Sequence, residues 1–318
     1  MKRFNVKRFK SSDKNIWDRH VSEFCPFSFL FYRDFMEYHN DRFIDFSLLI
    51  YEKSSLVALF PANLSHVNAI NSHMGLSYGG LIYDEDNAHD LFEKAVYASI
   101  LDFCKDHNIN TLNITLPPPF YATRIKDQAY AIISLGAEDV TPLLSMAVNL
   151  GDSSKAHKTK HKRFRKNTKR NTFSIVLDND LTPFWNKVLI PCLKEKHQSR
   201  PVHQLEEIVL LHQRFPEHIK QWNIYHEDKL LAGITLFIKN KIIRSQYGAT
   251  ALGHESSAPL DFLYLYLIQK YRTDGYHFFD MGSIPANSKF SYPKGLVNYK
   301  RELGCESYDQ QRFSFTHG

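Results

Sequence analysis

The stretch Ile242–Ala249, with the sequence IIRSQYGA, is an apolar-rich run bounded by turn residues, and this pattern predicts a β-strand. A loop of small residues follows, and Pro259 then suits the first position of a helix, with Ser257 as its cap. Residues 260–271 supply the apolar body of that helix, and residues 276–280 predict the next strand. Such a unit points a helix N-terminus and several backbone N–H groups at one place, which suits an anion such as a pyrophosphate. An ordinary β–α–β crossover without a ligand has the same pattern.

The composition indicates a globular protein with room for two domains. The chain has 318 residues, of which 43% are hydrophobic and 14% aromatic. No apolar run approaches the ~20 residues that span a bilayer, and the basic first eight residues lack the apolar segment of a secretory signal. We therefore expect a cytoplasmic protein. The four scattered cysteines lack a C-x-x-C pair, which predicts buried, reduced thiols rather than a metal or disulfide framework.

A pattern of segments occurs twice along the chain, in the order hairpin, strand, loop, helix, strand. The first copy contains Ile50-Tyr51, Leu56-Val57-Ala58 and Tyr78-Gly79-Gly80, and the second contains Ile224-Tyr225, Leu230-Leu231-Ala232 and Tyr247-Gly248-Ala249. In the first copy, residues 73–83 correspond to the predicted strand Ile242–Ala249. The repeat indicates a duplicated α/β module, with an N-terminal lobe at 1–150 and a C-terminal lobe at 151–318.

Four segments in the second half carry a resemblance to a known superfamily. They are PVHQLEE (201–207), SQYGA (245–249), FFDMGS (278–283) and GLVNYKRELG (295–304). In this order they resemble the acyltransferases of the GNAT superfamily, and more narrowly the tandem, FemAB-like branch associated with cell-envelope polysaccharide or peptidoglycan synthesis. The resemblance covers the last third of the chain well and the rest in outline. It implies an α/β (α+β) fold of two tandem GNAT-like modules, each a mixed, largely antiparallel sheet flanked by helices.

The resemblance also implies an acyl donor held by the loop before Pro259. The candidate contacts in this loop are Gly253, His254, Ser256, Ser257 and Ala258. The usual coenzyme-A loop of GNAT enzymes resembles R/Q-x-x-G-x-G/A, whereas this loop has a single glycine, which counts against acetyl-CoA specifically. Acyl-CoA remains the expected donor, without a metal, and aminoacyl-tRNA, which FemAB-like members use, is the alternative.

Charge indicates which copy holds the donor. The corresponding loop of the first copy, Asp84–Asn87, is acidic and would repel a pyrophosphate. We therefore expect the donor in the second lobe, and a first lobe that faces the substrate or acts as a scaffold. Two facing copies would create a cleft between the lobes, where ligands commonly bind.

The run 155–170 is strongly basic and contains no acidic residue, in a chain whose net charge is +6. It could bind a nucleic-acid backbone, dock on the anionic inner face of the membrane, or line a ligand site with its cations. A solvated surface helix has the same composition. The resemblance implies a basic helix that opens the second domain, so we expect phosphate or substrate contacts. The candidates are Lys162, Arg163 and Arg165, together with Gln246 and Lys300 downstream.

Acyl transfer to an amine needs a base, a donor to the oxyanion and an acid for the leaving group. Our candidates are His203, which follows a proline break and belongs to the residue type that can titrate near neutral pH, Tyr247 near the end of a strand, and Asp280 at the end of the next. Each also has an ordinary structural role as a helix-start, packing or turn-capping residue. We expect an N-acyltransferase that modifies an amine on a sugar nucleotide or envelope precursor. The alternatives are tRNA-dependent aminoacyl transfer and a non-catalytic module that binds a precursor or partner protein.

Overall fold

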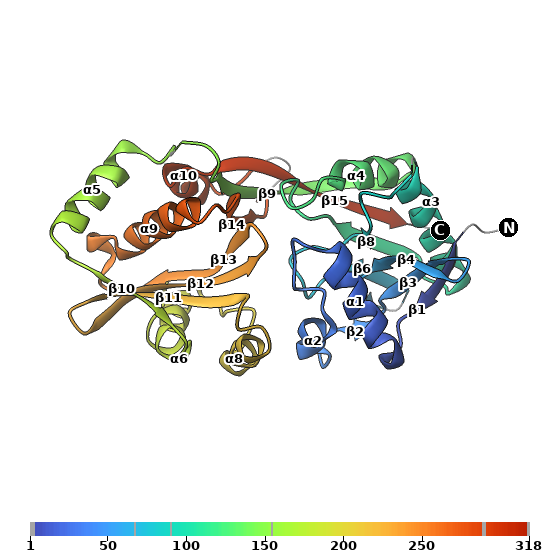
Figure 1. Ribbon diagram of the computed structural model, residues 1–318, viewed down its shortest axis with the longest axis horizontal. Coiled ribbons are helices and arrows are strands. Elements are labelled where there is room, and N and C mark those ends of the chain that lie inside the picture. The colour runs from blue at the N-terminus through green and yellow to red at the C-terminus, as the bar shows by residue number, and fades with distance from the viewer. Residues whose placement is uncertain (1–3, 67, 90, 154, 288–290, 317–318) are drawn as a thin grey trace. The chain divides into compact units, whose positions relative to one another are not determined.

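The computed structural model describes residues 4–66, 68–89, 91–153, 155–287 and 291–316. The chain divides into two compact units (Figure 1). Unit 1 comprises Met1–Leu144, Pro285–Ser291 and Tyr308–Gly318, and unit 2 comprises Ser145–Ile284 and Tyr292–Ser307. Within the described part of the chain, no helix is both long and apolar enough to cross a bilayer.

The two units are not contiguous in the sequence. Strand β15 (Glu306–Thr316) begins in unit 2 and enters unit 1, where it pairs antiparallel with β8 (Thr111–Thr115). The predicted lobe limits at residues 150 and 151 stay a prediction. The compact units differ from these lobes because the C-terminal strand β15 lies mostly in unit 1. Pairing between such distant segments leaves no local trace in the sequence.

Unit 1 contains two groups of paired strands, in the orders β1–β3–β4–β7 and β15–β8–β6–β5–β2. The remaining strands of this unit are β1 (Asn5–Arg8), β2 (Ile44–Asp45), β3 (Leu48–Glu52), β4 (Ser55–Phe60), β5 (Asn63–His66), β6 (Ala69–Ser72), β7 (Ile82–Tyr83) and most of β9 (Glu138–Asn149). The helices are α1 (Lys14–Phe24), α2 (Arg33–Met36), α3 (Phe92–Asp106) and α4 (Ile125–Ser134).

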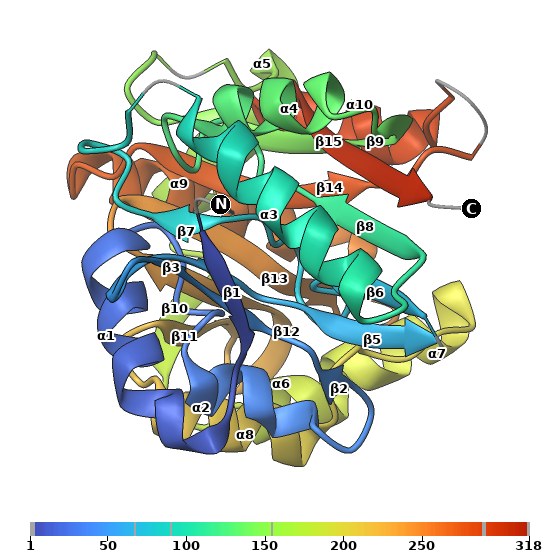
Figure 2. The ribbon, with the colours of Figure 1, turned by 90° about the vertical axis from the view of Figure 1, so that its right-hand side faces the viewer.

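Helices α3 and α4 lie side by side and close the core of unit 1 (Figure 2). On α3, Val96, Ile100 and Cys104 recur every fourth residue and are buried, so one face of the helix is apolar. These side chains join strand residues such as Phe60 and Ile114 in one hydrophobic cluster. All four cysteines are buried, as expected.

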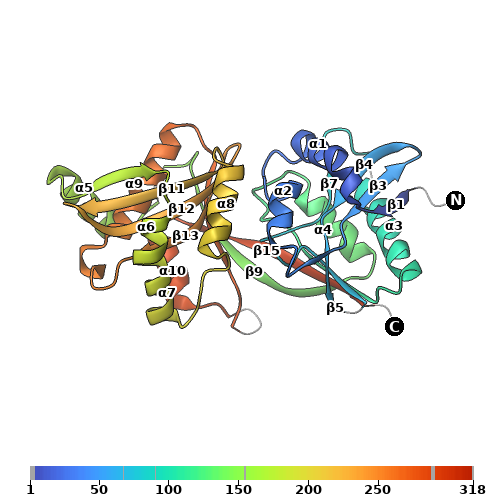
Figure 3. The same ribbon diagram turned by 90° about the horizontal axis from the view of Figure 1, so that it is seen from below.

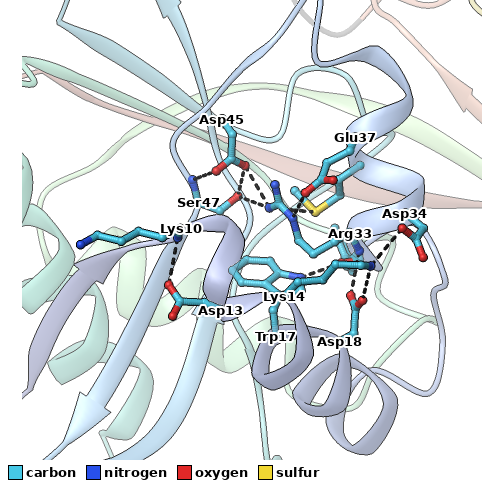
Figure 4. A network of polar contacts seen from close by, with 12 residues as sticks. Lys10, Asp13, Lys14, Trp17, Asp18, Arg33, Asp34, Glu37, Asp45 and Ser47 are labelled. Atoms are coloured by element: carbon cyan, nitrogen blue, oxygen red, sulfur yellow. Dashed lines mark hydrogen bonds and ion pairs between the residues drawn. The ribbon is translucent and has the colours of Figure 1, made fainter.

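A buried arginine fastens the helical start of unit 1 to its sheet (Figure 4). The Arg33 guanidinium donates to Glu37 at 3.0 Å and to Asp45 at 3.0 Å, and it stacks on the ring of Phe9 at 3.8 Å. Its Nη1 also donates to the Ser47 hydroxyl at 3.3 Å. Because its charge is paired and its donors are used, this network is a structural one.

Unit 2 is built on the strand order β10–β11–β12–β13–β14. Helices α5, α9 and α10 cover one face of this sheet, and α6, α7 and α8 cover the other (Figure 1, Figure 3). The strands are β10 (Ser174–Asp178), β11 (Ile219–His226), β12 (Lys229–Lys239), β13 (Ile242–Thr250) and β14 (Phe278–Ile284). The helices are α5 (Lys158–Lys169), α6 (Thr182–Phe184), which continues through a π turn into α7 (Ile190–His197), α8 (Leu205–Arg214), α9 (Pro259–Thr273) and α10 (Lys294–Glu302).

The predicted duplication is visible in the geometry of two hairpins. In β3–β4 the register shifts after Ile50, and in β11–β12 it shifts after Ile224, which is the equivalent residue of the repeat. The turns then place Lys53 and Glu227, again equivalent, at φ of 55° and 52°. A shared bulge and a shared left-handed residue are specific backbone features, so the two α/β modules with mixed sheets and flanking helices are confirmed.

Two local predictions are wrong. Residues 73–83 do not form a strand, apart from β7, because the Gly79 N–H bonds Thr115 O and the Gly80 N–H bonds the Ser72 hydroxyl, which folds the segment back. Helix α9 begins at Pro259 as predicted, but Ser257 does not cap it. Its hydroxyl donates to the carbonyl of His254, and Ala258 precedes the helix in the left-handed conformation.

Candidate active site

Strands β13 and β14 run parallel but pair over a short length only. The pairs are Ile242 with Phe278, Ile243 with Phe279 and Arg244 with Asp280. Strand β13 continues to Thr250 and stays paired with β12, whereas β14 continues to Ile284 without further pairs to β13. We call the region after the last pair the strand opening of unit 2. Beyond Arg244 and Asp280 the two strands form no further pairs with each other in the described part of the chain.

A β-bulge lies in β13 directly beside this opening. Tyr247 pairs with Thr235 and Ser245 with Leu236, so Gln246 is an extra residue in β13. A bulge turns successive side chains toward the same side and bends the strand, and bulges are frequent next to active sites. Here it follows Arg244, the last residue that pairs with β14.

The last pair before the opening is a buried ion pair. Arg244 Nη1 donates to Asp280 Oδ2 at 2.7 Å, and the backbone N–H of Gly282 donates to Asp280 Oδ1 at 2.7 Å. Asp280 is fully buried, while the Arg244 side chain is 15% exposed. Both carboxylate oxygens are therefore engaged, which suits Asp280 to hold the arginine and the Gly282 turn rather than to accept a substrate proton.

A buried lysine lies on the other side of Gly282. Lys300 of α10 is 7% exposed, and its Nζ donates to the Gly282 carbonyl at 3.1 Å. Burial lowers the pKa of Lys300 to about 8, although the nearby charge of Asp280 opposes the shift. The side chain thus supplies a cation with a low proton affinity close to the strand opening.

Tyr247 and His203 form a second part of the same site. His203 Nδ1 lies 2.6 Å from the Tyr247 hydroxyl, and the backbone N–H of His203 donates to that oxygen at 3.2 Å. Burial raises the pKa of Tyr247 to about 12, so the phenol is protonated and donates to Nδ1. Trp185 covers the phenol at 5.0 Å between ring centroids.

Gln246 connects the two parts. Its Oε1 accepts from Arg244 Nε at 3.2 Å, and its side chain lies close enough to the Tyr247 phenol to favour the phenolate slightly. A continuous line of polar groups therefore runs from His203 through the bulge to Asp280. The structure brings together the three predicted catalytic residues and two predicted substrate contacts, Gln246 and Lys300.

The basic helix and the predicted donor loop meet in a cavity of about 360 Å³. Lys162 and Arg163 of α5 line it together with Ser256 and Ser257. The described lining residues also include Lys166 and no Asp or Glu, so the cavity is cationic and rich in hydroxyl groups. Helix α5 is held there by Lys160, whose Nζ lies 2.6 Å from Asp261 in the first turn of α9.

The other predicted donor and phosphate residues lie elsewhere. His254 lines a separate cavity of about 570 Å³ with Lys187 and Asp228, and Gly253 and Ala258 line neither cavity. Arg165 is exposed on α5 and points outside the cationic cavity. The loop is therefore divided, because its short 3-10 turn at Glu255–Ser257 turns the two serines toward α5.

A second cavity of about 640 Å³ adjoins the cationic one, since both include Asn167 and Phe173 in their walls. Aromatic rings form part of its wall, with Phe164 at 4.8 Å and Phe173 at 5.1 Å from Phe262 between centroids. Its remaining wall carries amides and hydroxyls such as Gln269 and Thr168. A planar group that needs both stacking and hydrogen bonds fits this lining.

Sequence reasoning missed Arg244 and Lys166. The signal for Arg244 was a cation inside an otherwise apolar and small-residue strand, a position where a charge must find a buried partner. Lys166 lies four residues after Lys162, and helical periodicity places both on one face.

No family sequence model matches the chain, and no curated protein matches it in sequence. Solved structures do match. FemX superimposes with a TM-score of 0.69 over 98% of this chain and 97% of its own, at 12% identity. L-PGS from Bacillus licheniformis gives 0.57 over 82% and 81%, at 12% identity. The tandem GNAT protein from the clavulanic acid biosynthesis pathway gives 0.51 over 99% of each chain, also at 12% identity.

The fold is that of the tandem, FemAB-like GNAT proteins. The resemblance noted in the sequence is thereby confirmed at the level of structure. In this tandem GNAT-like chain, β13, α9 and β14 form the central unit of the second module. At 12% identity the match concerns the fold, and the chemistry rests on this chain's own residues.

Proposed function

We propose that the chain is a transferase that moves an acyl or aminoacyl group to an amine at the strand opening of unit 2. The observation that carries the proposal is the buried Lys300 beside the point where β13 and β14 separate. The bulge at Gln246 supports it, because it places a line of polar side chains beside the same point. The tandem GNAT-like fold adds support.

The reaction needs one bond formed and one broken. The amine nitrogen attacks the donor carbonyl carbon, the new C–N bond forms, and the C–S bond of a thioester or the C–O bond of an aminoacyl ester breaks. The Lys300 ammonium, together with backbone N–H groups of β13 beyond Arg244, would stabilise the oxyanion of the intermediate. The Tyr247 oxygen would accept the amine proton while its own proton passes to His203 Nδ1. The phenol would then protonate the leaving group and recover its proton from His203. Asp280 would keep Arg244 and the Gly282 turn in place.

We propose acyl-CoA as the donor, with its phosphates in the cavity lined by Lys162, Arg163, Ser256 and Ser257. The adjoining aromatic cavity would take its base by stacking. Acceptors would be amines on a sugar nucleotide or envelope precursor. Such donors are found in the cytoplasm, so we propose that the protein is cytoplasmic. Exposed cations of α5 could in addition contact the inner face of the membrane.

Aminoacyl-tRNA is the second candidate donor. The exposed face of α5 favours it, because this face carries cations outside the cavity, among them Arg165 and Lys169. A small coenzyme fills the cavities only, whereas an RNA backbone extends along the helix and pairs with these cations as well.

The test is a comparison of donor binding by thermal shift and calorimetry. Acetyl-CoA, longer acyl-CoAs and an aminoacylated RNA hairpin are offered to the full chain and to two variants. Lys162→Glu with Arg163→Glu should weaken either donor at least tenfold. Arg165→Glu is the matched control: it leaves acyl-CoA binding unchanged, and it weakens RNA binding and lowers its salt dependence. If neither donor class binds, or if the double variant binds as well as the native chain, the proposal fails and a non-catalytic module remains.

A further inference from the structure

Unit 1 has a cavity of about 360 Å³ where its own parallel strand pair ends. Strands β6 and β8 pair from Ala69 with Thr111 to Ser72 with Ile114, and residues after both ends line the cavity. The described lining residues include no Asp or Glu. One side of the cavity is apolar, and it is formed by Met74, Leu76, Val140, Leu143 and Phe313.

Arg312 gives this cavity a fixed positive charge. Its Nε donates to the Thr141 carbonyl at 2.9 Å, and its Nη2 donates to the same oxygen. These bonds fix the guanidinium, and among the described residues no carboxylate pairs with it. An arginine with its charge unpaired at a cavity wall is suited to a planar anion.

Asn71 adds a donor that the described residues leave unused. Its Oδ1 accepts from Asn113 Nδ2 at 3.0 Å, and Asn113 Oδ1 accepts from the Ser314 hydroxyl at 2.8 Å, which fixes the orientation of both amides. Asn71 Nδ2 is buried and has no hydrogen-bond partner within the described ranges. A buried donor without an acceptor costs about 1–3 kcal/mol, so an acceptor that enters the cavity would relieve this cost.

His73 supplies a third donor. Its Nδ1 accepts from the Gly75 N–H at 3.1 Å, so the proton of the neutral ring lies on Nε2. Burial lowers the pKa of His73 to about 3, so the ring stays neutral at physiological pH. The residue lines the cavity and is 5% exposed.

We propose that this cavity of unit 1 binds a carboxylate-bearing ligand, with Arg312, Asn71 and His73 as donors and the apolar side against the group next to the carboxylate. One cation and two neutral donors match a single negative charge, whereas a phosphate dianion would leave charge unpaired in a buried place. The volume holds a group of amino-acid size. This proposal does not depend on the proposed transfer chemistry.

The probe pair is N-acetyl-alanyl-alanine and its C-terminal amide, which differ only in the carboxylate. Dissociation constants are measured by NMR titration on the full chain. The carboxylate should bind at least tenfold tighter than the amide. Asn71→Asp keeps the acceptor for Asn113 but places a negative charge next to the ligand carboxylate, so it should abolish binding of the acid. Arg312→Gln should lower the affinity for the acid to that for the amide. Asn110→Asp and Arg19→Gln, both exposed in unit 1, are the matched controls.

Three outcomes would overturn the proposal. The first is equal affinity for acid and amide, or no binding of either up to about 10 mM, a free energy of binding of roughly 3 kcal/mol. The second is an unchanged dissociation constant in a folded Asn71→Asp variant. The third is inorganic phosphate that displaces the carboxylate probe at equal concentration, which would make the cavity a general anion site.

Discussion

Each unit contains a parallel strand pair that stops after three or four residue pairs. The side chains around the end of the pair differ between the two units. In unit 2 the last pair is Arg244 with Asp280, and Lys300 follows close by. In unit 1 the last pair is Ser72 with Ile114, and the neighbouring groups are neutral apart from Arg312. The two modules therefore share a backbone arrangement at this point and differ in the side chains around it.

The path of the chain beyond the last residue pair also differs between the two units. Strand β13 remains hydrogen-bonded to β12 up to Thr250, so the opening of unit 2 keeps a regular edge with a bulge. In unit 1 the chain leaves the sheet after Ser72 and folds back over it. The regular edge suits an extended donor, and the folded loop suits a small ligand. Substitutions can test how far this contrast holds.

The largest effect should come from the buried arginine of unit 1. Arg33→Ala leaves the charges of Asp45 and Glu37 without their partner, so it should lower the free energy of unfolding by about 3–5 kcal/mol. Chemical denaturation measures this. Arg19→Ala, exposed on α1, should change it by no more than about 0.5 kcal/mol. A loss below about 1 kcal/mol for Arg33→Ala would contradict the structural assignment of this network.

Next comes Lys300→Met, which keeps much of the side-chain volume and removes the cation beside the opening. Turnover should fall by about 10²–10³, as for the loss of one oxyanion donor, while donor affinity stays within about threefold. Steady-state kinetics and calorimetry separate the two quantities. Lys220→Met, half-buried on β11 and paired with Glu217, is the matched control and should leave turnover unchanged. Native turnover in Lys300→Met would remove the lysine from the mechanism.

A smaller effect concerns pH. The pKa of Lys300 in the folded chain is about 8, below its ordinary value of 10.5. Between these two values the unfolded chain binds more protons, so the Lys300 contribution to stability rises with pH over this window. Turnover should instead decline above about pH 8 as the ammonium is lost. Lys300→Arg, which keeps its charge, should move this decline upward, and an unmoved decline would assign it to another group.

Much of the fold could be predicted because its signals are local. The apolar run at 242–249, the proline at 259 and the repeated hairpin residues act within a few positions. The entry of β15 into unit 1 could not be predicted. Its pairing with β8 joins segments about two hundred residues apart, and no local sequence pattern indicates such a pairing. The segment 73–83 was misjudged because Gly79 lies in close contact with Ser72, which a strand would not allow.

Five residues of the candidate site could be named from the sequence, and their catalytic roles stay predictions; the connections between them could not be foreseen. His203, Tyr247, Asp280, Gln246 and Lys300 were named from residue type and position near strand or helix ends. Their linkage depends on Arg244 and on the bulge, and both follow from tertiary pairing. The donor loop was treated as one unit, whereas the short turn at Glu255–Ser257 directs only the two serines toward α5.

The central claim is that unit 2 holds the donor at its strand opening and along α5. Hydrogen–deuterium exchange of the full chain, with and without a saturating donor from the thermal-shift panel, tests it most directly. Donor should slow exchange at residues 246–250, 255–262 and 158–169, and leave residues 69–80 of unit 1 unchanged. Slower exchange confined to unit 1, or a bound donor that leaves these segments of unit 2 unprotected, would contradict the account.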